Sequence, residues 1–172
     1  PETAPLAPIN PYGASKAHVE RMLADAQTAD GLRWAALRYF NACGADPEGD
    51  LGECHDPETH LIPVALEAAA GLRDALPLYG TDYPTRDGTC VRDYIHVSDL
   101  VRAHSAALAY LAAGGASDTF NCGYGRGFSV LEVVEAVKRA SGRTFEVRLG
   151  PRRPGDPAHI VAATDKLRGA LG

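Results

Sequence analysis

Apolar residues in the first quarter of the chain follow a helical pattern and then a strand pattern. Asn10-Pro11 is typical of a helix start and Gly31 of a helix end. The run LRWAALRYF over residues 32–40 is short and mostly apolar, as in a buried parallel strand. The helix between these signals is predicted from four apolar residues at helical spacing: Val19, Met22, Leu23 and Ala26.

The rest of the chain alternates in the same way, which predicts an α/β fold. Polar, glycine-rich loops are expected over 42–59 and 80–89. Ser129 and Glu132 form the capping-box pattern of a helix that Gly142 closes. The other expected elements are a helix over 61–70 stopped by Gly71, a helix capped by Ser98 and running to about 113, and strands over 76–79, 91–97, 118–122 and 144–149.

Composition narrows the class of protein. The net charge of −5 does not provide the basic footprint of a nucleic-acid binder, so we expect no nucleic-acid partner. No apolar run approaches the roughly 20 residues of a membrane span, so we expect no membrane partner. The cysteines, at 43, 54, 90 and 122, have no C-x-x-C spacing and are interpreted as reduced thiols of a cytoplasmic protein. The proline-rich start and abrupt end favour a piece of a larger protein.

One pair of residues suggests acid–base chemistry. Tyr12 and Lys16 form Y-x-x-x-K at the start of the first helix, and a spacing of four places both side chains on one face. A cation beside a phenol favours the phenolate, so the pair could take a proton from an alcohol. The ordinary alternative is a solvated surface pair. Asn41 follows the expected strand 32–40, where ligands of parallel sheets bind; the alternative is a turn asparagine.

Six sequence blocks occur in one order along nearly the whole chain. They are PYGASK, RYFNACGA, HLIP, DGTCVRDYIHVxDL, NCGYGRGxSVLEV and PRRPGDPA. Y-x-x-x-K alone marks only a broad superfamily, whereas the ordered set of the other five is far more specific. In this the chain is similar to the UDP-glucose 4-epimerases, members of the extended short-chain dehydrogenase/reductase superfamily.

The resemblance implies a domain organisation. Residues 1–41 would end an NAD-binding Rossmann domain, and 42–172 would mainly form a smaller α/β domain that binds the nucleotide-sugar. Residues 91–125 would return to the Rossmann domain. The glycine-rich cofactor loop and the serine or threonine partner of the catalytic tyrosine would lie upstream of Pro1. The sequence given could therefore be inactive by itself. The whole protein would be a homodimer.

The resemblance also implies site residues. Tyr12 would be the catalytic acid–base and Lys16 would hold the nicotinamide ribose of NAD and lower the pKa of the tyrosine. Phe40 would contact the cofactor. His60 stands where many relatives carry asparagine, and Ile160 where the size of the sugar's C2 substituent is gated. The substrate-binding set would be Asn41, His60, Leu61, Pro77, Leu78, Tyr79, Arg92, Arg153, Asp156 and Ile160.

The arginines also fit a diphosphate by their chemistry, because guanidinium groups are planar and always charged. The alternative is two surface ion pairs, Arg92 with Asp93 and Arg153 with Asp156. Residues 123–127 read G-x-G-x-G, one residue short of the dinucleotide fingerprint, and are interpreted as a tight strand-to-helix turn. Cys54, His55 and His60 lack a fourth ligand, so no metal is expected. His96 and His104 are interpreted as structural.

The implied activity is inversion of C4 of a UDP-hexose (UDP-glucose and UDP-galactose) through a 4-keto sugar, as part of galactose metabolism. The alternatives are another UDP-sugar enzyme of the superfamily, such as a UDP-arabinose or UDP-N-acetylhexosamine 4-epimerase or a dehydratase, and a non-catalytic remnant that binds UDP-sugar without a cofactor. The other enzymes would share Tyr12 and Lys16, whereas the remnant would bind UDP through Arg92 and Arg153.

Overall fold

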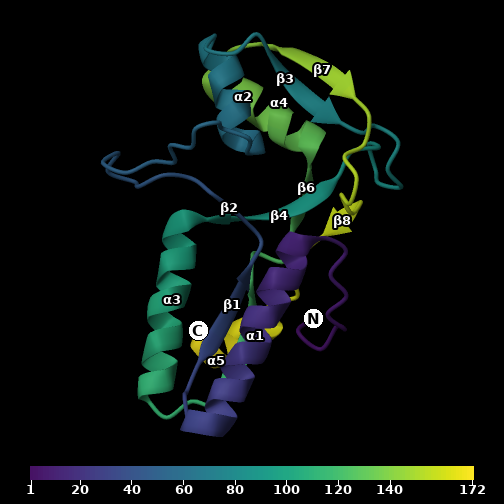
Figure 1. Cartoon of the computed structure of the whole chain (residues 1–172). Helices are drawn as coiled ribbons and strands as arrows, with labels where there is room; N and C mark the ends of the chain where they lie inside the picture. The colour runs from purple at the N-terminus through teal and green to yellow at the C-terminus, as the bar shows by residue number, and fades with distance from the viewer.

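The computed structural model describes residues 1–172 and is an α/β structure, as the sequence predicted. Figure 1 shows a long lower body and a smaller upper lobe joined by short strands. Its elements in chain order are α1 (Pro11–Asp30), β1 (Ala35–Tyr39), β2 (Asn41–Cys43), α2 (Leu61–Ala70), β3 (Ala75–Tyr79), β4 (Val91–His96), α3 (Val97–Ala112), β5 (Asp118–Cys122), β6 (Gly127–Ser129), α4 (Val130–Ser141), β7 (Glu146–Gly150), β8 (His159–Ile160) and α5 (Asp165–Leu171).

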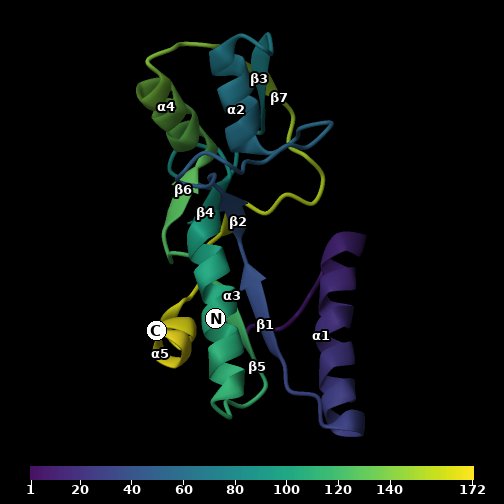
Figure 2. The same cartoon turned by 90° about the vertical axis from the view of Figure 1, so that its left-hand side faces the viewer.

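The lower body is built on a parallel strand pair. β1 and β5 pair in register from Ala35 opposite Asp118 to Tyr39 opposite Cys122. Helices α1 and α3 lie on opposite sides of this pair, as the two views in Figures 1 and 2 agree. After β1 the chain crosses into the upper lobe to form α2 and β3, and it returns to the lower body through β4 and α3.

The upper lobe has its own apolar core. Strands β3 and β7 pair in parallel, and helices α2 and α4 pack against each other beside them. Small and branched side chains fill the space between these elements, which lets the helices approach closely. The core residues are Val64, Ala65, Ala69, Leu76, Val134 and Val137.

Short strands at the junction hold the two parts together. β4 pairs with β2 and β8 in parallel and with β6 in antiparallel. The carboxylate of Asp93, on β4, is fully buried and accepts backbone N–H groups of Tyr124, Gly125 and Ala162 at 3.0, 2.9 and 3.1 Å. Because a buried carboxylate is costly unless it is hydrogen-bonded, these bonds fix three segments at one point.

Most helix boundaries were predicted correctly. The Asn10 side chain accepts the Gly13 N–H at 2.8 Å and begins α1, and Gly31 ends it in a left-handed conformation. Ser129 and Glu132 form the expected reciprocal capping box. The expected Ser98 cap was wrong, because the cap lies two residues earlier, at His96, whose ring accepts the Ser98 N–H at 3.2 Å.

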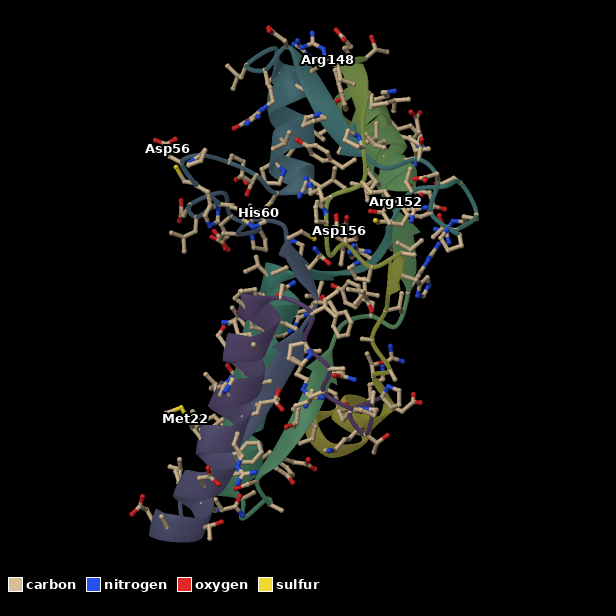
Figure 3. The ribbon with its side chains drawn as sticks, turned by 45° about the vertical axis from the view of Figure 1, so that its right-hand side comes forward. Met22, Asp56, His60, Arg148, Arg152 and Asp156 are labelled. Atoms are coloured by element: carbon tan, nitrogen blue, oxygen red, sulfur yellow. The ribbon has the colours of Figure 1, made fainter.

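One expectation about burial was wrong. Strand β1 is half-buried rather than buried, and Tyr39 is exposed. The reason is that β1 has a strand neighbour only on its β5 side, so its other edge is open. Helix α1 is exposed as well: none of its residues is buried, and Met22, with 68% exposure, points away from the molecule (Figure 3).

Three short strands were not predicted. β2 overlaps the start of the loop expected over 42–59, while β6 and β8 have only three and two residues. Such short strands carry no alternation of their own and exist because β4 pairs with them. No helix combines the length and the apolar character that crossing a membrane requires.

Candidate functional site

Tyr12 and Lys16 occupy the first turns of α1, at the level where the lower body meets the upper lobe (Figures 1 and 2). The ammonium nitrogen of Lys16 lies 5.2 Å from the centroid of the Tyr12 ring. Tyr12 is 71% exposed, and Lys16 makes no ion pair with a carboxylate. The spacing of four therefore produces the expected contact, with both groups accessible to a ligand.

Phe40 and Asn41 lie where β1 ends and β2 begins. The backbone N–H of Phe40 donates to the Cys122 carbonyl at 3.2 Å, which prolongs the β1–β5 pairing by one residue. Asn41 is exposed and opens β2 opposite Tyr94 on β4. Asn41 therefore stands at the carboxyl end of a parallel strand, although it begins a second strand and not a turn.

A cavity of about 230 Å³ lies in the upper lobe. Residues from the first turn of α2 and from β3 line this cavity, because both elements pack on the same core. Four of the predicted substrate residues contribute to it, namely Leu61, Pro77, Tyr79 and Arg153. Sequence reasoning missed Glu58, Thr59, Val64, Arg73 and Leu76.

One of the missed residues had a usable signal. Val64 lies three residues after Leu61, so both occupy one face of α2. Pro77 and Tyr79 are two residues apart on β3 and share one face of the strand, while Leu76, on the other face, also contributes to the lining. The intervening Leu78 points the other way and is 1% exposed, so only its main-chain atoms are available to a ligand.

Arg153 enters the cavity rim stacked on an aromatic ring. Its guanidinium carbon lies 4.2 Å from the centroid of Tyr79, and the group forms no hydrogen bond or ion pair. The neighbouring Arg152 stacks 4.3 Å from Tyr83 but also donates to Asp82 at 2.7 Å. Stacking orients a guanidinium without consuming its donors, so Arg153 is left ready to bind an anion.

Arg92 belongs to a second group at the junction. It donates to Asp156 at 3.4 Å, and its side chain is 13% exposed. Ile160 lies opposite Arg92 in the β4–β8 ladder. The ion pairs Arg92–Asp93 and Arg153–Asp156, which the sequence offered as the alternative, are both absent. Asp93 is buried and accepts backbone N–H groups, and Asp156 pairs with Arg92.

His60 lies outside the cavity lining. It precedes α2, on the loop that projects from the side of the molecule in Figure 3. Its Nδ1 lies 2.9 Å from Glu53 and 2.9 Å from Glu58. The backbone N–H of His60 also donates to Glu58 and holds the pKa of that carboxyl below its usual range.

Burial shifts the acidity of several groups around the junction. It raises the pKa of Tyr94 to about 12, so this phenol stays protonated at neutral pH. It also raises the pKa of Cys43 and of Cys122. All four cysteines are free thiols in the structure.

Close packing explains the glycines over residues 123–127. A Cβ at Gly123 would lie 2.7 Å from Asp93 Oδ2, and one at Gly127 would lie 2.5 Å from Val91. These glycines therefore permit the approach of β4 to its neighbours. The interpretation as a turn holds, although the turn leads first into β6 and only then into α4.

The parallel α/β fold and the Y-x-x-x-K pair on its first helix are features of the short-chain dehydrogenase/reductase class. A sequence profile described as the NAD dependent epimerase/dehydratase family matches residues 1–123. The chain belongs to this family.

Individual relatives carry more specific names. The chain is 55% identical over 171 residues to a UDP-glucose 4-epimerase of Azospirillum brasilense, covering 99% of this chain and 49% of the relative. A UDP-glucose 4-epimerase of Lacticaseibacillus casei is 51% identical over 171 residues, with 99% and 52% covered. The chain thus spans about half the length of these curated relatives.

Solved structures agree. The UDP-glucose 4-epimerase from Brucella ovis, in complex with NAD, matches with a TM-score of 0.92 and 54% identity over 96% of this chain and 51% of that one. The resemblance to epimerases predicted from the sequence blocks is therefore confirmed at the level of family and fold.

Proposed function

We propose that this chain is part of an NAD-dependent UDP-hexose 4-epimerase that interconverts UDP-glucose and UDP-galactose. The observation that carries the proposal is the unpaired guanidinium of Arg153, stacked on Tyr79 at the rim of a cavity that also contains Leu61 and Pro77. A free, oriented cation beside an apolar and aromatic wall suits a nucleoside diphosphate. The names of the relatives support the same substrate class.

Tyr12, Lys16 and Phe40 would hold NAD in this chain. Lys16 fits the role because its ammonium group is free of carboxylates and can donate to ribose hydroxyls. The NAD named with the Brucella ovis structure supports the choice of cofactor. When bound, NAD supplies hydride chemistry at C4 of the sugar.

Tyr12 would move the proton. As the phenolate, the exposed side chain of Tyr12 would accept the proton of the sugar 4-hydroxyl, and Lys16 lies one turn along the same face with its ammonium nitrogen 5.2 Å from the ring centroid. The same phenol returns the proton when the sugar is reduced from the opposite face. Both directions need only one acid–base group, because the sugar and not the protein turns over.

The remaining residues would hold the UDP-sugar. Arg153 and Arg92 would bind the diphosphate, Asp156 the uridine ribose, and residues 77–79 the uracil. Asn41 and His60 would donate to the sugar-nucleotide, and a main-chain group of Leu61 to the diphosphate. Ile160, which is bulky and partly exposed, would disfavour an N-acetyl group at C2.

The proposal extends to the setting of the whole protein. Residues 1–41 and 91–125 would belong to its cofactor domain, and most of the others to its substrate domain. We infer a cytoplasmic homodimer that acts in galactose metabolism. The free thiols support a reducing compartment.

Proton NMR of the full-length protein with UDP-galactose tests the activity. We expect the anomeric signal of UDP-glucose to grow until the two sugars reach equilibrium. Binding of UDP-galactose without conversion would support a non-catalytic remnant instead. Conversion of UDP-arabinose or UDP-N-acetylhexosamine, with UDP-galactose left unchanged, would assign the protein to another epimerase of the superfamily.

A further inference from the structure

Four potential metal ligands gather on the loop between β2 and α2. Glu53, His55, Glu58 and His60 each offer one ligand atom, and these atoms lie within 4.8 Å of one another. From the sequence, Cys54, His55 and His60 lack a fourth ligand. The structure leaves Cys54 outside the cluster and adds two carboxylates. We propose that these four residues form a Zn²⁺ site.

The separations fit a tetrahedral ion. Ligands about 2.0–2.2 Å from zinc at tetrahedral corners lie about 3.3–3.6 Å apart. Glu53 Oε1 lies 3.0 Å from His55 Nδ1 and 2.9 Å from His60 Nδ1. Glu58 lies 2.9 Å from His60 Nδ1 through Oε1 and 3.7 Å from His55 Nδ1 through Oε2. The four ligand atoms lie within 4.8 Å of one another, so the side chains must rotate to close the set around an ion.

Glu58 is already prepared as a ligand. Its side chain is only 5% exposed, and its Oε1 accepts the backbone N–H groups of Thr59 and His60 at 2.7 Å each. Its Oε2 accepts no hydrogen bond. Outer hydrogen bonds that orient a carboxylate while leaving one oxygen open are typical of metal sites.

Charge and access also favour a divalent cation. Two carboxylates and two neutral imidazoles carry a charge of about −2, which one Zn²⁺ neutralises. The side chains of His55 and His60 are 56% and 57% exposed, so an ion can enter from solvent.

The site would fix one wall of the substrate cavity. Glu58 and Thr59 line that cavity, and α2 begins at Leu61 directly after His60. A metal bound here would hold the loop against the start of α2. Zinc on Nδ1 of His60 leaves the Nε2–H of the ring as a donor, so the inference neither requires nor excludes contact of His60 with substrate.

Zinc titration of metal-free, full-length protein against a chromophoric chelator tests the site. We expect His55→Ala and Glu53→Gln each to weaken one zinc-binding step by at least about tenfold. Both residues are exposed loop residues, so their replacement leaves the core intact. His18→Ala, which removes an exposed histidine of α1, should leave zinc binding unchanged.

Two outcomes would overturn the inference. One is zinc binding of equal stoichiometry and affinity in the unmodified protein and in both loop variants. The other is no zinc uptake by the unmodified protein. Cobalt absorption typical of tetrahedral coordination, present in the unmodified protein and lost in His55→Ala, would support it. Because no step requires UDP-sugar, the result is independent of the proposed epimerase activity.

Discussion

At the scale of single residues, the capacity of the cavity to bind an anion depends on which arginine side chains already pair with a carboxylate. Arg152 and Arg153 are adjacent in sequence and each stacks on a tyrosine. Only Arg152 also has a carboxylate partner, Asp82, whose pKa it lowers through a hydrogen bond. The two arginines therefore differ in their capacity to bind an anion, although they are adjacent in the sequence.

This difference gives a matched pair of substitutions. Arg153→Ala should weaken UDP binding to the full-length protein by about 1.5–3 kcal/mol, the usual value of a hydrogen bond to a charged group. Arg152→Ala removes a guanidinium of the same size and should leave UDP affinity unchanged. Isothermal titration with UDP measures both. Equal losses in the two variants would show that general positive charge, and not the position of Arg153, governs binding.

The sequence predicted contacts between neighbouring residues of one helix better than it predicted ion pairs between distant segments. The spacing of Tyr12 and Lys16 was enough to predict their contact, because helix geometry is local. The pairing of Arg92 with Asp156 spans 64 residues and depends on β8, a two-residue strand that leaves no pattern in the sequence. Glu53 and Glu58 were missed for a related reason: only the fold of the loop turns them toward His55 and His60.

At the scale of elements, capping signals proved the most dependable feature of the sequence. The capping box at α4 and the cap of α1 were predicted, since each depends on residues three positions apart, whereas the Ser98 cap expected for α3 was wrong and α2 has no side-chain cap. The exposure of β1 was not predicted, because it depends on which strands pair with it. Strands β2, β6 and β8 form by pairing with β4, so a local sequence pattern does not predict them.

The α4 cap can be tested directly. Ser129 is fully buried, accepts the Glu132 N–H at 3.1 Å and donates to Asp87. Ser129→Ala should lower the free energy of unfolding by about 0.5–2 kcal/mol through loss of the cap. Ser141→Ala, at the exposed far end of the same helix, should change it by less than about 0.5 kcal/mol. Urea unfolding of both variants makes the comparison, and equal effects would contradict the role of the cap.

At the scale of the whole molecule, the chain divides the proposed work between its two parts. The lower body carries Tyr12 and Lys16 in the first turns of α1, and the upper lobe carries the cavity with Arg153. β4 and the buried Asp93 tie these parts together. Catalysis at the sugar and recognition of the nucleotide should therefore be separable by mutation.

The turnover and UDP-hexose affinity of Tyr12→Phe in the full-length protein test this account most directly. We predict that kcat falls by about 10²–10⁴-fold, the usual contribution of a positioned acid–base group, while the dissociation constant of UDP-galactose stays within about twofold. Tyr110→Phe, which removes a hydroxyl from a tyrosine packed on Phe120, should keep normal turnover. Near-normal kcat in Tyr12→Phe would contradict the assignment of this phenol as the acid–base group.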